Sequence, residues 1–398
     1  MSEKQNHSRG FLRNIISLGI VSFFTDISSE MVYPLLPQLV KAVGGTPASL
    51  GLIEGLAEAT ASGLRAVSGY ISDRFRRRKI LVILGYSLSA LAKPLLGASR
   101  LWQMVLGFRF LDRTGKGIRT APRDAILADS ASEAERGKWF GFHRAMDTLG
   151  AALGPLSAFL LLGLGISFRQ LFYWAVIPAG IAVLVLILLV KEVKPRAGGG
   201  KFQLNFRGLD RRYHYYLLIS GVFVLGNFSN TFLILRAQEL GMSLARSTLL
   251  YLVYNLSYAF ISMPAGMLSD RIGRKRVLLF SFLLFSAVYL GFGYNQHLWA
   301  LWVLFFFYGL VDGTKEGTQR ALIADLVPSE KRASAYGIYF ALVGVLMFFS
   351  STIAGLVWKK FGAEIVFTYS AGLGLIASLL LFFLLPNQIN PSPNRINK

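Results

Sequence analysis

Runs of about 20 apolar residues recur along the whole chain, and the charged residues gather between them. Each run is long enough to cross a hydrocarbon layer of roughly 30 Å as a helix. Membrane-spanning strands are shorter and alternate between polar and apolar residues, which these runs do not do. Of the 398 residues only 16% are charged, against roughly 25% in a soluble domain. The sequence therefore predicts an all-α polytopic membrane protein.

The apolar runs and their polar breaks predict twelve transmembrane helices. Their approximate ranges are 13–40, 48–72, 79–98, 101–127, 138–163, 169–190, 213–240, 244–269, 277–295, 298–326, 334–358 and 362–386. The segment 191–212 carries charges, a proline and three consecutive glycines, which is typical of a flexible linker. We expect an N-terminal six-helix bundle at 1–190, a cytoplasmic linker at 191–212 and a C-terminal six-helix bundle at 213–398.

Basic residues in the predicted loops indicate the orientation. The loops on one side contain 25 Lys and Arg residues and those on the other side contain 6. Because cytoplasmic loops are enriched in basic residues, both termini should lie in the cytoplasm, with the protein in a bacterial inner membrane. The basic N-terminus resembles a signal peptide, but Asp26 and Glu30 interrupt its apolar run, so we expect a retained first helix. The net charge of +21 is mostly this topological signal and does not indicate nucleic acid binding.

Several kinds of chemistry are excluded by composition. The chain has no Cys, which removes disulfides, thiolate metal sites and cysteine catalysis. Its four His are scattered, so we expect no metal site, and no cofactor loop or Ser-His-Asp set indicates an enzyme. A nucleotide-binding Gly-Lys-Ser/Thr loop is also absent from the sequence, so ATP should not drive the protein. The expected partners are the lipid bilayer, a small-molecule substrate and protons, and the expected state is a monomer.

The two predicted bundles share an internal repeat. The string from Gly69 to Arg74 recurs from Gly266 to Arg271 at an offset of 197, and Ala125–Asp129 recurs as Ala321–Asp325 at an offset of 196. Two parallel six-helix repeats joined by a linker are typical of transporters whose halves rock around a central site.

The repeated loops carry a family resemblance. GMLSDRIGRKR at 266–276 resembles the signature loop of the major facilitator superfamily, and GYISDRFRRRK at 69–79 resembles its partner, although Arg76 stands where the family has Gly. The resemblance implies a secondary transporter with alternating access. Glycines should allow close helix contact and aspartates should pair with arginines to latch one state, unless the basic cluster only anchors topology. The residues concerned are Gly69, Asp73, Arg74, Gly266, Asp270, Arg271 and Arg274.

Ionisable residues within the predicted helices are functional candidates because charge in a membrane is costly. Asp26 and Glu30 lie four residues apart, on one face of the first helix, ahead of Pro34 and Pro37, which should bend it. We interpret both acids as proton or cation coupling residues. The alternative is a buried pair with an Arg of the fourth or fifth helix.

The second helix carries Glu54, Glu58 and Arg65, which lie within about 40° of each other around the helix axis. We expect Glu58 to be a proton or cation coupling residue and Arg65 to line the substrate cavity. Glu54 lies near the helix end, where water at the membrane surface could solvate it. The stripe must face the bundle interior or an aqueous cavity.

The fourth helix has the densest charge. Arg109, Arg113, Lys116, Arg119 and Arg123 share about one third of its circumference, with Asp112 among them. Because Arg grips carboxylates through two hydrogen bonds, Arg109 and Arg113 are candidates for an anionic substrate. The alternative is a structural network with Asp112, Asp147 and the acids of the first two helices.

The remaining candidates are polar rather than charged. Gly150, Gly154 and Pro155 resemble the fifth-helix motif of superfamily antiporters, which implies export, although Ala158 replaces the family's later glycine. In the second half, Asn227, Asn230, Tyr251, Asn255 and Tyr258 suit hydrogen bonds to a polar ligand, although tyrosines also pack at interfaces. Asp312, Lys315, Glu316, Gln319 and Arg320 crowd the cytoplasmic half of the tenth helix and should form a gate.

A narrower resemblance concerns the substrate. TDISSEMVYPLLP at 25–37 and DRTGKGIRTAPRDAILAD at 112–129 look like a bacterial branch with magnetosome-type and siderophore-linked facilitators. This implies proton-coupled uptake of an anionic solute, with a ferric-siderophore chelate as candidate. The competing hypothesis is proton-antiport efflux of drugs or toxic metabolites. A non-transporting membrane sensor with the same fold is the third.

Overall fold

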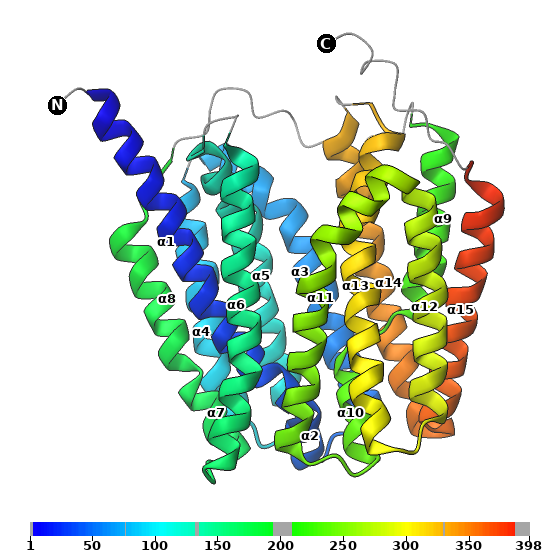
Figure 1. Cartoon of the computed structure of the whole chain (residues 1–398). Helices are drawn as coiled ribbons and strands as arrows, with labels where there is room; N and C mark the ends of the chain where they lie inside the picture. The colour runs from blue at the N-terminus through cyan, green and yellow to red at the C-terminus, as the bar shows by residue number, and fades with distance from the viewer. Residues whose placement is uncertain (1–2, 76, 132–134, 194–208, 329–330, 387–398) are drawn as a thin grey trace. The chain divides into compact units, whose positions relative to one another are not determined.

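The computed structural model describes residues 3–75, 77–131, 135–193, 209–328 and 331–386, without the side chains of residues 3–11, 66, 70, 73–75, 136 and 333. In these ranges every regular element is helical (Figure 1). The helices are α1 (Glu3–Val32), η1 (Tyr33–Leu35), α2 (Leu36–Ala42), α3 (Pro47–Phe75), α4 (Arg78–Gly97), α5 (Trp102–Asp129), α6 (Arg136–Gly163), α7 (Phe168–Trp174), α8 (Val176–Leu189), α9 (Arg211–Gly226), α10 (Thr231–Glu239), α11 (Leu244–Ile272), α12 (Arg274–Tyr294), α13 (Leu298–Leu326), α14 (Arg332–Phe361) and α15 (Ala363–Leu384).

These helices fall into the twelve predicted segments, because α1 continues through η1 into α2, α7 is followed by α8, and α9 by α10. Within the described ranges, nine segments are long and apolar enough to cross a membrane by length and composition. The other three are α3, α5 and α11, which have 28 or 29 residues and carry many of the charged and hydroxyl-bearing side chains. Such polar helices are stable in a membrane only when they face protein or water. They are therefore the first places to look for a functional site.

Two interruptions in the helices have local causes. The predicted bend in the first segment is confirmed, because Tyr33–Leu35 form a 3₁₀ turn around Pro34, which lacks the N–H of a helical hydrogen bond. The prediction of one continuous helix over 213–240 is wrong at residues 227–230. Asn227 there has φ −98° and ψ 80°, outside the helical region. Asn side chains compete with helical hydrogen bonds, which favours such a break.

The chain forms two compact units, which are described separately. The first contains residues 1–45, 56–201 and 244–252, and the second contains 46–55, 202–243 and 253–398. Residues 46–55, which were predicted to belong to the N-terminal bundle, thus group with the second unit. Residues 244–252, which were predicted to belong to the C-terminal bundle, group with the first. The domain boundaries at 190 and 213 remain a prediction, and most of the predicted linker lies outside the described residues.

In the first unit α4 packs along α5, and α1 packs against both α6 and α8 (Figure 1). Glycines let α4 and α5 touch through their backbones. A Cβ atom on Gly85 would lie 2.5 Å from the carbonyl oxygen of Gly115, and one on Gly115 would lie 2.4 Å from that of Gly85. Only glycine tolerates such an approach, so the charged helix α5 is held closely against α4.

In the second unit α12 packs against α13 and α15, and α9 packs against α14 and α15. Aromatic rings fill these contacts. Phe223 of α9 stacks on Phe282 of α12 with ring centroids 4.1 Å apart, and the Phe285 ring of α12 lies 4.7 Å from Phe223. Each such pair contributes about 0.5–1.5 kcal/mol beyond the buried area.

The internal repeat is visible in the helix packing of each unit. A Cβ atom on Gly117 of α5 would meet Leu64 and Ala61 of α3 at 2.6 and 3.0 Å. One on Gly313 of α13 would meet Ile261 and Tyr258 of α11 at 2.4 and 2.7 Å. These positions correspond at offsets of 196 and 197, so the two units use the same glycine for the same helix contact.

Candidate functional site

The carboxylates Asp26 and Glu30 of α1 lie where α6 approaches most closely. A Cβ atom on Gly150 would come within 2.9 Å of Asp26 Cβ, and one on Gly154 within 2.8 Å of Glu30 Cβ. The predicted glycine motif thus packs directly against both acids. The glycines fix the position of the two carboxylates relative to α6.

Charges from the two neighbouring helices α5 and α6 act on these acids. Asp26 interacts electrostatically with Asp147, Lys116 and Arg123 as well as with Glu30. Glu30 is near Lys116 and Arg113 and is hydrogen-bonded by Tyr251, while its Oε2 atom is buried without a partner among the described residues. Among the residues that the structure describes, neither acid forms the fixed ion pair with an Arg that the alternative predicted. The acids instead share a field of several cations.

The arginines of α5 each have a protein partner. Arg109 pairs with Asp112 at 2.9 Å, and Arg113 pairs with Glu58 of α3 at 3.4 Å. Both guanidinium groups are buried, with side-chain exposures of 5% and 10%. The structural network considered from the sequence is therefore present around them. Substrate contact by either arginine requires that its pair opens or is shared.

Two buried cations adjoin this network, and sequence reasoning left Lys93 out. Lys93 of α4 is 2% exposed, interacts electrostatically with Asp112, and donates to the Ser89 carbonyl oxygen at 3.2 Å. Arg119 donates to Ser89 Oγ at 2.7 Å and lies over the Tyr86 ring at 4.2 Å. The position of Lys93 deep inside the apolar run 79–98 was the available signal, because a charged residue is costly in a membrane.

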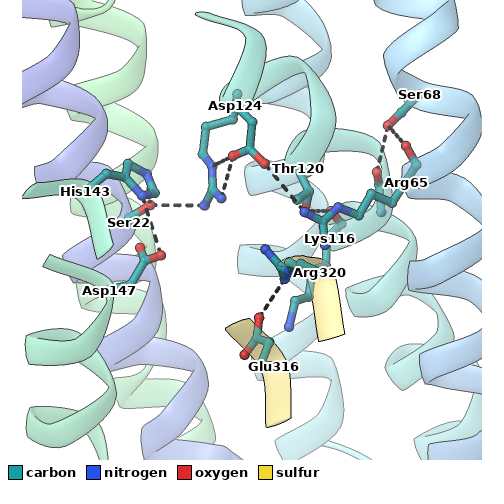
Figure 2. A network of polar contacts seen from close by, with 12 residues as sticks. Ser22, Arg65, Ser68, Lys116, Thr120, Asp124, His143, Asp147, Glu316 and Arg320 are labelled. Carbon is teal, nitrogen blue, oxygen red and sulfur yellow. Dashed lines mark hydrogen bonds and ion pairs between the residues drawn. The ribbon is translucent and has the colours of Figure 1, made fainter. Parts of the chain in front are cut away.

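A second polar network connects α1, α5, α6 and α3 (Figure 2). Ser22 Oγ lies 2.9 Å from His143 Nε2, and Arg123 donates to the same hydroxyl at 3.2 Å. On the other side of the imidazole ring, His143 Nδ1 lies 3.5 Å from Asp147 Oδ2. Asp147 thus joins His143 rather than forming a simple Arg pair.

The same network continues from Arg123 toward α3. Arg123 pairs with Asp124 at 2.8 Å, and Asp124 also pairs with Arg65 at 3.6 Å. Arg65 and Asp124 are partly exposed, with side-chain exposures of 38% and 32%. The predicted cavity residue Arg65 is therefore held by an acid that the sequence reasoning did not select.

In the second unit, the break at residues 227–230 carries two of the predicted asparagines. Tyr308 of α13 donates to Asn230 Oδ1 at 2.8 Å and to Asn227 Oδ1 at 3.3 Å. Tyr254 donates to Asp312 at 2.8 Å, and Lys315 donates to the same carboxylate at 2.5 Å. Tyr254 and Tyr308 were missed, although Tyr308 precedes Asp312 by one helical turn.

The other second-half candidates separate into different surroundings. Tyr258 hydrogen-bonds to Glu316, which also pairs with Arg320 at 2.6 Å. Tyr251 lies in the first unit, with its ring 5.1 Å from Tyr33, over which Arg109 sits at 5.6 Å. Asn255 is half-buried on α11.

Glu54 corrects a sequence interpretation. Its side chain is buried, and it accepts a hydrogen bond from Ser229 Oγ at 3.0 Å. Surface solvation of this carboxylate is therefore wrong. Position near a helix end does not determine exposure when another segment covers that end.

The helix ends near the repeated loops hold matching ion pairs. Arg78 at the start of α4 pairs with Asp129 at 2.5 Å, and Arg274 at the start of α12 pairs with Asp325 at 3.4 Å. Arg78 corresponds to Arg274, and Asp129 to Asp325, at an offset of 196. Arg274 also pairs with Asp270, while Arg271 is exposed.

The predicted glycines of these loops differ. A Cβ atom on Gly69 would meet Ala121 at 3.3 Å, so that contact is close. For Gly266 the expected close contact is not found, since a Cβ atom there would have no described atom within 4 Å. The side chains of Asp73 and Arg74 lie outside the described residues, so their latch role stays a prediction.

Comparison with known proteins identifies the family. The profile of the Major Facilitator Superfamily matches residues 18–211 and 215–398. An uncharacterised MFS-type transporter of Methanocaldococcus jannaschii is 41% identical over 393 residues, covering 96% of this chain and 98% of the relative. An uncharacterised protein of Mycobacterium tuberculosis is 28% identical over 393 residues, covering 96% and 95%. A solved structure of a point mutant of the nucleoside transporter NupG has a TM-score of 0.78 at 14% identity, covering 94% of this chain and 100% of that one.

The fold and these matches define a multi-pass membrane transporter with two bundles of six helices. The chain belongs to the major facilitator superfamily. It is a secondary transporter, which moves a small-molecule substrate across a lipid bilayer.

Proposed function

We propose that the protein carries a small anionic solute together with protons. The observation that carries this proposal is the cation-rich face of α5 beside Asp26 and Glu30 of α1. Arg109, Arg113 and Lys116 lie within the field of these acids. A site with so many cations attracts an anion and repels a lipophilic cation.

The proposed coupling follows from charge balance. When Asp26 and Glu30 are ionised, they neutralise part of the positive charge on α5. Binding a proton to either acid removes a negative charge, so the positive potential of the α5 cations attracts an anion more strongly. Proton and anion therefore favour each other, which is the condition for symport. Glu58 takes part through its pair with Arg113.

The proposed substrate class is a carboxylate-bearing chelate of the ferric-siderophore type, and the proposed direction is uptake. Guanidinium and ammonium groups both bind carboxylates, and an iron chelate made of carboxylates presents several of them. The proposed second-half contacts are Asn227, Asn230 and Tyr258, whose amide and phenol groups suit a polar ligand. We also propose a bacterial inner membrane location and cytoplasmic termini, following the distribution of basic residues. The proposed state is a monomer, which is the default of the family.

Binding and flux assays on the purified full chain test this function. A thermal-shift panel should compare ferric dicitrate, citrate and lipophilic drug cations. A ligand at 100 times its Kd stabilises a protein by about 2.7 kcal/mol. We expect a shift with the anions, and faster uptake into proteoliposomes when the outside is acidic. A response only to lipophilic cations would overturn the proposal.

A second candidate is proton-antiport efflux of drugs or toxic metabolites. It is favoured by Gly150 and Gly154, which belong to the string that resembles the antiporter motif and pack against Asp26 and Glu30. In this case protonation of the acids would expel a cation from them. Proteoliposomes separate the two functions, because an antiporter moves its substrate against the direction of proton flow.

A further inference from the structure

We propose that Lys116 of α5 is the residue that binds the anionic group of the substrate, and that it alternates between this group and the carboxylates of α1. This inference rests on the proposed function and names the contact through which it operates. The anionic group that Lys116 would bind is a carboxylate.

The arginines of α5 are each held by other side chains. Arg109 and Arg113 pair with Asp112 and Glu58, Arg119 donates to Ser89, and Arg123 pairs with Asp124. Removing any of these cations from its partner leaves a charge unpaired at membrane depth, which is costly. The arginines are therefore suited to fix the shape and potential of the site.

Lys116 differs from them in both exposure and pairing. It is an exposed residue of α5, between the buried Arg113 and Arg119. Among the described residues its ammonium group has no ion pair or hydrogen bond. A solvent-accessible cation on a helix whose other cations are paired is the one available to a ligand without breaking a protein contact.

Carboxylates of two other helices act electrostatically on this ammonium group, although none of them, in the described part of the chain, bonds to it. Glu58 of α3 and Glu30 and Asp26 of α1 attract it electrostatically, and Arg113 of the same helix repels it. Lysine has a flexible four-carbon stem and a compact charge, so it can move among partners more readily than a planar guanidinium. Lys116 can therefore exchange an α1 carboxylate for a substrate carboxylate.

The internal repeat supplies a comparison within the same chain. At the offset of 196, Lys116 corresponds to Asp312 of α13. Asp312 is satisfied within its own unit, because it accepts from Tyr254 at 2.8 Å and from Lys315 at 2.5 Å. The matching position on α5 lacks such partners in the described residues, so the difference points to a ligand role for Lys116.

Coupling then follows from the groups that face Lys116. With Asp26 and Glu30 ionised, the ammonium group is drawn to α1, and the substrate loses its cation. With a proton on either acid, Lys116 binds the substrate. Other groups also set this balance. Arg123 and Asp147 act on Asp26, and Arg109 and Tyr251 act on Glu30. Arg113 and Glu58 act on Lys116 itself.

The test measures binding of ferric dicitrate to the full-length protein at pH 6 and pH 8. Lys116→Gln should weaken binding at least tenfold and remove most of the dependence of affinity on pH, while Lys116→Arg should restore binding. Titration of the probe itself is common to all variants. Lys138→Gln is the matched control, because Lys138 is exposed and its ammonium lies over the Trp139 ring at 4.7 Å.

The outcomes are distinguishable from those of the proposed function. If the wild-type protein binds none of the anionic probes, the proposed function fails and this inference fails with it. If the wild type binds them and Lys116→Gln binds equally well with the same pH dependence, only the role of Lys116 is overturned.

A measurement on the wild-type protein covers the case in which the variants fail to fold. Bound ferric dicitrate should protect Lys116 from acetylation, quantified by mass spectrometry, and should leave Lys138 as reactive as before. Equal acetylation of Lys116 with and without the probe would contradict the proposed contact.

Discussion

The packing of α6 on α1 allows a sharp test at Gly154. In Gly154→Ala, the new Cβ atom would lie 2.8 Å from Glu30 Cβ, from the Ile27 carbonyl oxygen and from the Met31 backbone nitrogen. Two of these are backbone atoms, which cannot rotate away. The two helices must therefore separate by about 0.6 Å to reach the 3.4 Å of an ordinary contact.

The expected cost combines two effects of opposite sign. Overpacking of this kind destabilises by about 1–3 kcal/mol. Replacing Gly by Ala inside a helix stabilises by roughly 0.5–1 kcal/mol. We therefore expect Gly154→Ala to lower the free energy of unfolding by up to about 2.5 kcal/mol and to reduce transport, because Glu30 is displaced.

Gly141→Ala is the matched control on the same helix. A Cβ atom there meets no described atom within 4 Å, so only the helix term of about 0.5–1 kcal/mol should remain. The two variants should shift thermal unfolding in detergent in opposite directions. Equal stability of the two would refute the close contact between α1 and α6, and with it the idea that Gly154 positions Glu30.

Three further predictions address the ion pairs and the second unit. Glu58→Gln should destabilise the protein by about 1–3 kcal/mol, because Arg113 loses Glu58 as its ion-pair partner. The double variant Glu58→Gln, Arg113→Gln should recover most of this stability in thermal unfolding, and no recovery would contradict the pairing. Double-mutant cycles on Arg78 with Asp129 and on Arg274 with Asp325 should give similar coupling free energies of about 0.5–3 kcal/mol. A value near zero at either pair would show that this ion pair does not stabilise its helix end. Tyr308→Phe should cost about 1 kcal/mol of stability, and Tyr289→Phe should cost less. The reason is that the Tyr308 hydrogen bond to Asn230 is 2.8 Å long, whereas the Tyr289 hydrogen bond to Asn227 is 3.4 Å long. A larger loss of stability in Tyr289→Phe than in Tyr308→Phe would count against this network.

The sequence predicted the helices well because apolar length dominates membrane folding. The twelve segments, the bend at Pro34 and the internal repeat all depend on local composition or on direct self-similarity. The break at residues 227–230 was missed because Asn227 and Asn230 lie within an apolar run that reads as continuous. A polar break inside a membrane becomes possible only when tertiary partners such as Tyr308 satisfy it.

The ion-pair partners of the charged residues were much harder to predict than the helix faces on which these residues lie. Helical angles put Arg109, Arg113, Lys116 and Arg119 on one side of α5, yet three of these are buried and Lys116 is exposed. Rotation about a helix axis gives a direction but does not give the distance to a neighbour or the depth in the bundle. Lys93 and Ser89, which lie beside this face, belong to another helix that the angles cannot locate.

Comparison of the two repeats separates scaffold from site within a single chain. Gly117 and Gly313 make the same helix contact, and Arg78–Asp129 and Arg274–Asp325 form the same ion pair. Between these fixed points, the aligned faces of α5 and α13 diverge: Asp112 corresponds to Tyr308, and Lys116 to Asp312. Packing tolerates only glycine at the contacts, so those positions stay equal in both repeats. Side chains that bind a ligand are free to differ, because an asymmetric solute requires different groups on its two sides. The divergence therefore lies where a substrate is expected to bind.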